Sequence, residues 1–176
     1  MIQIAMQLFR AKGYNGVGLT ELLSVSGAPK GSFYHHFPDG KEQLAEAALR
    51  ASGTIIGDLI DSCFTPASSE QDAVECLMSA IAAYFEKSNF RAGCPIASVV
   101  VDAVPQSERL TNAAQNVLSD WKRRAIGHAM RWGRTKQSSQ DFADRFAIAL
   151  EGAWMIARIK QSSDPFRHVS KMLGSR

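Results

Sequence analysis

The sequence predicts an all-α protein that has an N-terminal three-helix domain with a helix-turn-helix and a larger C-terminal helical domain. Apolar residues recur at spacings of three and four along the chain, and no segment shows the strict alternation of a strand. Glycine and proline separate short periodic segments near the N-terminus from long ones later. Hydrophobic residues make up 45% and charged residues 21% of the 176 residues, which is enough for a real core. We expect the domains to span residues 1–43 and 44–176.

The first helix presents Ile4, Leu8 and Phe9 on one apolar face, and Gly13 follows its last periodic residue. Glycine commonly follows the end of a helix because it adopts left-handed backbone angles without steric cost. The helix is therefore expected to end at Gly13.

Two short helices follow. Leu19 begins an apolar segment, Gly18 before it is the expected N-cap, and Gly27 ends this second helix. Pro29 begins the third helix, where its missing N–H costs nothing. The pattern predicts a helix, a tight turn at residues 27–28 and a second helix.

The rest of the chain predicts longer helices separated by Gly, Pro and Ser. The expected helices are a long one from about Lys41 to Cys63, one ending near Lys87, a short one at Ile96–Val104, then about Ser107–Trp132, about Gln140–Gln161 and a last one around Phe166–Leu173.

The helix at residues 140–161 is apolar on two nearly opposite faces. A helix of this kind must bury both faces, and a domain this small covers only one. We therefore expect a second copy of the chain to cover the other, which makes the protein a homodimer. The predicted dimer surface consists of Ile148, Gly152, Met155, Ile159, Phe166, Val169, Met172 and Leu173.

Composition excludes several classes of protein. The three cysteines, Cys63, Cys76 and Cys94, form an odd set without a CxxC pair, which argues against a disulfide framework and against a zinc site. We expect no metal and no cofactor. No apolar run approaches the ~18 residues of a membrane span, so a cytoplasmic protein is expected. A net charge of +3 is too small to indicate nucleic acid by itself.

The third short helix has two distinct faces. At 100° per residue, Phe33 and Phe37 lie together on the inner side, while Ser32, Tyr34 and His35 lie on the outer arc. Such an arc suits the major groove of DNA, where polar side chains contact phosphates and base edges. From spacing alone, the alternative is two ordinary core helices with an aromatic pair.

Residues 4–49 resemble the N-terminal domain of the TetR family of one-component regulators. The matching stretches are "AMQLFRAKGYNGVGLTELL" and the more specific "SGAPKGSFYHHFPDGKEQLAEAAL". The second stretch, together with "GCPIA" at 93–97, is similar to the LmrA/YxaF-type branch. The resemblance implies an all-helical dimer that reads DNA with Pro29–His36 and binds an effector in its C-terminal domain. The expected DNA-binding residues are Thr20, Pro29, Lys30, Gly31, Ser32, Tyr34, His35 and Lys41.

Two departures from the family pattern affect the expected affinity. Many members have a threonine at the start of the second helix, where this chain has Val17 and Gly18, and Thr20 is the nearest hydroxyl. The family usually has a basic arm before the first helix, and this sequence begins almost inside that helix at Met1. Either the sequence is shortened before this helix or the protein binds DNA with fewer contacts, so the alternatives differ in the expected affinity and share the same binding mode.

Large aromatic and flexible apolar residues on neighbouring helices predict a small, mostly apolar effector pocket. The same stripes are also typical of plain core. The candidate lining is Ile60, Met78, Ile81, Phe85, Cys94, Trp121, Phe146, Leu150 and Trp154.

The sequence therefore favours a ligand-responsive regulator, most simply a repressor, that binds double-stranded operator DNA as a homodimer. The alternative is a small-molecule-binding helical protein whose helix-turn-helix no longer binds DNA. An enzyme has almost no support, since no paired carboxylates, nucleophile–base spacing or metal motif stands out. The basic run Lys122–Arg124 is interpreted as a solvated helix face rather than a second DNA contact.

Overall fold

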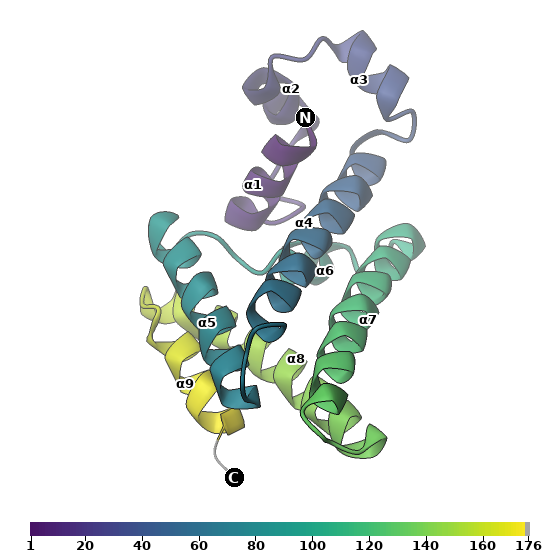
Figure 1. The fold of residues 1–176 in the computed structure, drawn as a ribbon. Coiled ribbons are helices and arrows are strands. Elements are labelled where there is room, and N and C mark those ends of the chain that lie inside the picture. Colours follow the sequence, from purple (N-terminus) through teal and green to yellow (C-terminus); the bar gives the residue numbers. More distant parts are fainter. Residues whose placement is uncertain (175–176) are drawn as a thin grey trace. The chain divides into compact units, whose positions relative to one another are not determined.

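The computed structural model describes residues 1–174, and over these residues the chain forms nine helices and no strand (Figure 1). The all-α prediction is confirmed. Within the same range, no helix is long and apolar enough to cross a membrane. The helices are α1 (Ile2–Lys12), α2 (Leu19–Ser26), α3 (Lys30–His36), α4 (Gly40–Phe64), α5 (Glu70–Lys87), α6 (Ala97–Ala103), α7 (Glu108–Arg131), α8 (Lys136–Lys160) and α9 (Asp164–Gly174).

Most helix ends lie within two residues of the prediction, and the start of α8 is the exception. The helix begins at Lys136 rather than Gln140, because Thr135 is its N-cap and the Thr135 side chain accepts a hydrogen bond from the Ser138 N–H at 3.2 Å. A side-chain cap of this kind satisfies one of the unpaired N–H groups of a first helical turn. Residues 136–139, which lie between two predicted helices, are therefore the first turn of α8.

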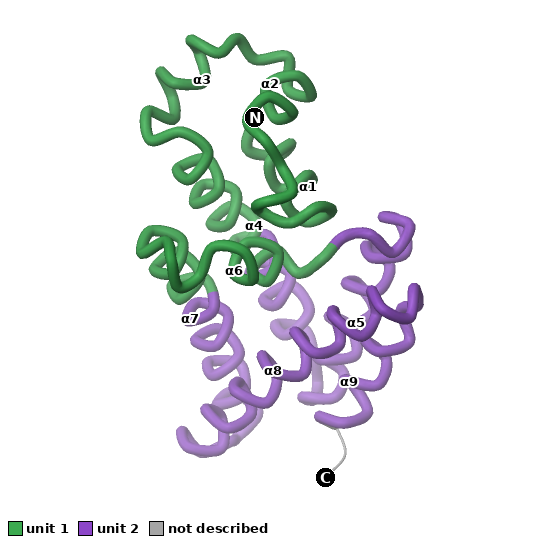
Figure 2. The backbone as a smooth tube through the Cα atoms, turned by 180° about the vertical axis from the view of Figure 1, so that it is seen from behind, with its two compact units in different colours: residues 1–54, 93–117 green, residues 55–92, 118–176 purple. Residues whose placement is uncertain are grey.

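The chain divides into two compact units (Figure 2). Unit 1 comprises residues 1–54 and 93–117, and unit 2 comprises residues 55–92 and the chain from residue 118 onward. Unit 1 thus contains α1, α2, α3 and α6 with the first parts of α4 and α7. The predicted domain boundary after residue 43 divides the chain into two continuous stretches, whereas each compact unit combines two separate stretches. The boundary therefore stays a prediction.

The core of unit 1 forms where α1 packs against α2 and α6. Phe9, Val17 and Leu22 are almost completely buried. The buried Arg10 donates from Nε to the Gly93 carbonyl at 2.9 Å, and the Gly93 N–H donates back to the Arg10 carbonyl at 3.0 Å. The Gly93-Cys94-Pro95 segment is thereby fixed to α1, which gives it a structural role.

In unit 2, α9 packs against α5 and α8. Phe166 lies at the centre of this contact, with its ring centroid 5.7 Å from those of Phe85 and Trp154. Phe166, Val169 and Leu173 are all buried by their own chain. The apolar face of α9 thus covers its own unit, and a role of these three residues in the dimer surface stays a prediction.

The structure also corrects the prediction about the cysteines. Cys63 and Cys76 form a disulfide between the last turn of α4 and α5, with Cα atoms 5.6 Å apart. The odd count was misleading because the third residue, Cys94, is buried in unit 1. The spacing of cysteines along the sequence does not reveal which helix ends the fold brings together.

Candidate nucleic-acid interface

The turn between α2 and α3 has the geometry that the sequence predicts. Gly27 has a φ of 65° in the left-handed region, and the Ala28 N–H donates to the Ser26 hydroxyl at 3.3 Å. Pro29 is the N-cap of α3 rather than its first residue. A non-glycine residue would be strained at position 27, so this glycine sets the direction in which α3 leaves the turn.

The inner side of α3 is apolar and its outer side is polar. Phe33 is 2% exposed, and its ring lies 5.6 Å from that of Phe37. A Cβ added at Gly31 would meet nothing within 4 Å, so the backbone there is open to close approach. Seven of the eight predicted DNA-binding residues are exposed, namely Thr20, Pro29, Lys30, Gly31, Ser32, Tyr34 and His35.

Lys41, the eighth predicted residue, is partly buried. Its Nζ lies 4.1 Å from the centroid of the Tyr14 ring, which is a cation–π arrangement. Burial lowers the pKa of Lys41, and the nearby Asp102 carboxylate opposes this shift. A phosphate contact by Lys41 would require the ammonium to leave the Tyr14 ring.

The turn between α3 and α4 is held by side chains that the sequence analysis did not single out. Arg109 donates from Nη2 to Asp39 Oδ2 at 2.7 Å, and its Nε lies 3.4 Å from Glu46 Oε2. The neighbouring Ser107 hydroxyl donates to Glu42. No periodicity links residues about 70 positions apart in the sequence, so no sequence signal was available for this contact.

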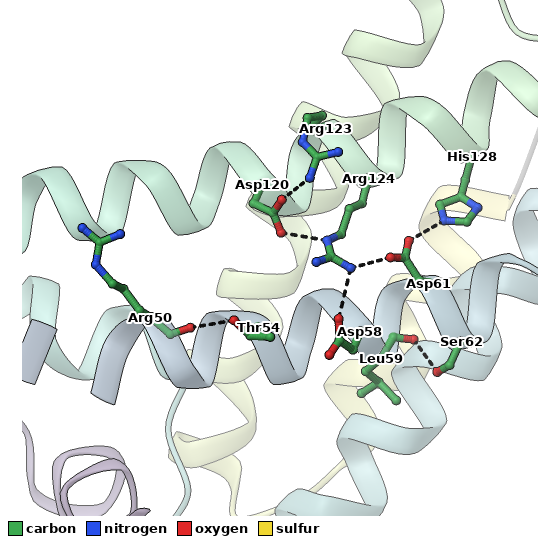
Figure 3. Close-up of polar contacts among 10 residues, drawn as sticks. All are labelled: Arg50, Thr54, Asp58, Leu59, Asp61, Ser62, Asp120, Arg123, Arg124 and His128. Atoms are coloured by element: carbon green, nitrogen blue, oxygen red, sulfur yellow. Dashed lines mark hydrogen bonds and ion pairs between the residues drawn. The ribbon is translucent and has the colours of Figure 1, made fainter. Parts of the chain in front are cut away.

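The basic run Lys122–Arg124 is not simply a solvated face. Arg124 bonds to three carboxylates of unit 2, those of Asp58, Asp61 and Asp120 (Figure 3). Lys122 pairs with Asp144 of α8, and only Arg123 is largely exposed. The run therefore fixes α7 within unit 2.

Asp61 is the centre of this polar cluster. It bonds to Arg124 and lies 2.7 Å from Nε2 of the buried His128. Burial by itself raises the pKa of Asp61, but hydrogen bonds from His128 and Arg124 outweigh burial and leave the pKa below its ordinary value. The cluster also borders a cavity of about 510 Å³.

The nine residues of the predicted effector pocket are all buried. Eight of them belong to unit 2, and Cys94 belongs to unit 1. Trp154 also donates from Nε1 to the Ala92 carbonyl at 2.9 Å. The side chains fill the core, so a role in binding an effector stays a prediction.

The exposed apolar surface of α8 and α9 contains the other members of the predicted dimer set. Ile148, Met155, Ile159 and Met172 are 62–76% exposed, and Gly152 is exposed as well. Gly152 and Met172 border a mainly apolar cavity of about 350 Å³ that also involves Ile156. Ile156 was missed, although it lies one turn after Gly152 on the same helix face.

Over residues 1–174, no group of His, Cys, Asp and Glu has an arrangement that could hold a metal ion. The candidate nucleic-acid interface consists of exposed groups on α2 and α3. The packing of the Phe33 and Phe37 rings on the inner side of α3 holds these groups in place.

Comparison with known proteins gives a consistent result along the whole chain. Residues 2–48 match the bacterial regulatory proteins of the tetR family, and residues 71–172 match the C-terminal domain of LmrA/YxaF-like transcriptional regulators. The uncharacterized HTH-type transcriptional regulator YxaF of Bacillus subtilis is 26% identical over 173 residues, which cover 98% of this chain and 91% of YxaF.

Solved structures agree with the sequence matches. The regulatory protein TetR from Rhodobacter sphaeroides superposes with a TM-score of 0.87 at 25% identity, covering 98% of this chain and 94% of that one. A cysteine mutant of the TetR family regulator CifR, solved with 26-bp operator DNA, has the same fold with a TM-score of 0.82 at 22% identity, covering 98% and 92%. The helix-turn-helix, the all-α fold and both family matches agree, and the chain belongs to the TetR family of transcriptional regulators with a C-terminal domain of the LmrA/YxaF-like type.

Proposed function

We propose that the chain is a repressor that binds operator DNA as a homodimer through α3 and is released by a small, largely apolar effector. The observation that carries this proposal is the division of α3 into a buried aromatic side and an exposed polar side. Phe33 holds the helix to unit 1, while Ser32, Tyr34 and His35 face away from the core.

The exposed groups of α3 suit contacts with a duplex. Lys30 supplies a charge for phosphate, Gly31 allows close approach of the backbone, and Tyr34 supplies a hydroxyl and a ring edge. Groups of these kinds contact phosphates and base edges in the major groove. The relative CifR was solved with operator DNA, which supports operator DNA as the partner of this chain.

A homodimer is required because one seven-residue helix reads too few bases for useful specificity. Two copies related by a two-fold axis read half-sites one helical turn, ~34 Å, or more apart. The surface formed by Ile148, Gly152, Met155, Ile159 and Met172 is the proposed interface, and Ile156 extends it. A contiguous apolar patch of this kind on a small domain is typical of an interface between protein chains.

The effector is proposed to bind within the C-terminal domain among the buried residues of unit 2. Met78, Phe146 and Trp154 provide flexible and aromatic surface of the kind that binds apolar ligands. Since these side chains now fill the core, an effector would have to displace some of them. Such a rearrangement couples the two sites if DNA and effector favour different arrangements of the chain.

Repression follows most simply from occupancy, since a dimer seated on an operator blocks access to the promoter. A regulator of this kind acts where the DNA is, so we place the chain in the cytoplasm.

The direct test is a gel-shift titration with the DNA upstream of the chain's own gene, at several salt concentrations. We expect saturable binding whose log affinity falls steeply and linearly with log salt, because phosphate contacts release counterions. Ser32→Ala should weaken binding, while Ser79→Ala on α5, which is exposed and belongs to unit 2, should not. Equal affinity for upstream and unrelated DNA would refute the proposal.

A further inference from the structure

Cys63 lies in the last turn of α4, and Cys76 lies in the second turn of α5. Their Cα atoms are 5.6 Å apart, a separation in the ordinary range for a disulfide, and the two residues are bonded. The short connection at residues 65–69 brings the two helix ends together. The thiols are therefore already in place to join, without a rearrangement of either helix.

The two cysteines differ in exposure. Cys63 is 4% exposed, whereas Cys76 is exposed on the surface of α5. Oxidation of cysteine follows thiolate character and access to solvent. An oxidant in solution thus reaches Cys76 first, and Cys63 is positioned beneath it to resolve the product.

The compartment decides whether this bond is permanent. A protein that binds DNA works in the reducing cytoplasm, where disulfides are rare and are usually transient or redox-sensing. A permanent structural disulfide does not fit that compartment, and a reversible one does.

We propose that Cys63 and Cys76 form a reversible oxidation site for peroxides, and that the cross-link changes the affinity of the chain for its operator. The reversibility in the cytoplasm and the effect on operator affinity both rest on the proposed function. The Cys76 thiolate attacks one oxygen of hydrogen peroxide, the O–O bond breaks, and the hydroxide that leaves takes up the proton lost from the Cys76 thiol. Cys76 is now a sulfenic acid.

The Cys63 thiol then attacks the sulfenic sulfur of Cys76. The S–S bond forms, the S–O bond breaks, and water leaves with the Cys63 proton. In sum, two thiols and one peroxide give one disulfide and two waters, and two electrons pass from sulfur to oxygen. Low-molecular-weight thiols reverse the reaction by thiol–disulfide exchange.

The cross-link acts on the part of α4 that is fastened to other helices of unit 2. Phe64, next to Cys63, is fully buried, with its ring centroid 5.5 Å from those of His128 and Trp132 and 6.0 Å from that of Phe146. The disulfide adds α5 to these attachments. Because α4 is one continuous helix that begins at Gly40, shortly after α3, the cross-linked turn and the end next to α3 belong to the same helix.

The test compares full-length protein reduced with dithiothreitol and then exposed to hydrogen peroxide. Mass spectrometry should show the loss of two hydrogens and a linked pair of peptides containing Cys63 and Cys76. Amide exchange at the last turn of α4 should be slower in the oxidised form. The operator dissociation constant should change by at least about fivefold, the lower end of ordinary coupling between sites.

Four variants make the test specific. Cys76→Ser, at an exposed position, should keep the reduced affinity before and after peroxide, and Cys63→Ala should behave in the same way if it folds. Ser79→Ala, exposed on α5, keeps both residues of the pair and should respond like the unmodified chain. Glu75→Gln, next to Cys76 and exposed, controls for a local change on α5.

Three results would overturn the proposal in whole or in part. If peroxide leaves both thiols open to alkylation, the pair is not an oxidation site. If the cross-link forms but the operator affinity stays within twofold, the coupling is wrong and the proposed function still stands. If neither redox form binds upstream DNA, the proposed function fails and the coupling fails with it, while the mass measurement still decides whether the site is oxidised.

Discussion

Arg109 in the first turn of α7 donates a hydrogen bond from Nη2 to Oδ2 of Asp39, over 2.7 Å, in the turn that follows α3. Asp39 lies three residues beyond the end of the proposed DNA-reading helix. The Asp39 carboxylate raises the pKa of Arg109 through this hydrogen bond, so the guanidinium stays charged. The contact therefore helps to fix the point at which α3 gives way to α4.

Arg109→Ala should weaken operator binding a few-fold and leave the thermal midpoint nearly unchanged, since exposed ion pairs contribute little to stability. Asp39→Asn should have a similar effect, and the double variant should lose no more than either single one. Arg167→Ala, which breaks an exposed pair with Asp164 on α9, is the matched control. Fully additive losses in gel-shift titrations would show that the two residues act separately.

Phe33 and Tyr34 are adjacent on α3. Substitution of Phe33 should mainly lower the stability of the protein, and substitution of Tyr34 should mainly lower its affinity for DNA. Phe33→Ala removes an almost fully buried ring, which typically costs ~3–5 kcal/mol. Tyr34→Ala truncates a side chain that is 43% exposed, so its free energy of unfolding should change little while operator affinity falls. Chemical denaturation and gel shifts check this pair, and a Tyr34→Ala variant with normal DNA binding contradicts the proposed interface.

Charge on the exposed face of α8 should separate the proposed dimer. Ile148→Glu or Met155→Glu places a carboxylate in an apolar interface, where an uncompensated charge costs about 3 kcal/mol or more. Sedimentation at micromolar concentration should then show monomers with little operator affinity. Val101→Glu on α6, a residue 75% exposed, is the control and should leave the dimer intact. Dimers that persist in both α8 variants would exclude this face.

The Asp61 cluster predicts a dependence of stability on pH. Burial opposes ionisation of Asp61, but His128 and Arg124 outweigh burial and lower the pKa of Asp61 below its ordinary value of 3.8. A carboxyl with a lowered folded-state pKa contributes stability above its ordinary pKa and loses that contribution as pH falls through the folded-state pKa.

Asp61→Asn should therefore lower the free energy of unfolding near neutral pH by no more than about 1 kcal/mol, because the side chain is partly exposed and screened. The difference from the unmodified chain should shrink below about pH 4, the ordinary range for Asp. Thermal melts from pH 7 to pH 3 measure it, with Asp141→Asn as an exposed control outside the cluster. A difference that grows toward low pH would contradict the assignment.

Two helical glycines should respond in opposite directions to substitution by alanine. A Cβ at Gly53 would lie 2.6 Å from both methyl carbons of Val117, a stiff β-branched side chain, so Gly53→Ala should lower the thermal midpoint. A Cβ at Gly127 would meet nothing within 4 Å, so Gly127→Ala should gain up to ~1 kcal/mol of helix propensity. Equal shifts of the two midpoints would contradict the close approach at Val117.

The sequence predicted those parts of the fold that depend on residues close together in the chain. Gly27 and Pro29 mark the turn between α2 and α3 by backbone preference alone, so both helices were predicted correctly. Apolar periodicity predicted α9 as well, but it cannot say what covers an apolar face. Phe166 was therefore assigned to a partner chain, although it packs against Phe85 and Trp154 of its own unit.

Contacts between segments that are far apart in the sequence could not be predicted, for the same reason. The pairing of Cys63 with Cys76 depends on where two helices end in space, and the bond from Arg109 to Asp39 joins positions 70 residues apart. The predicted pocket shows the same limit, because a stripe of large apolar residues looks alike whether it lines a cavity or fills a core.

The segment at residues 93–117 has a practical meaning for protein engineering. It lies inside the stretch that matches the LmrA/YxaF-like C-terminal domain, yet it packs with α1 through Arg10 and Gly93 in unit 1. A chimera that joins residues 1–48 to a foreign sensor domain would place α1 against a segment that did not evolve with it. A transplant that keeps residues 93–117 from the donor of α1 should preserve that packing and fold better.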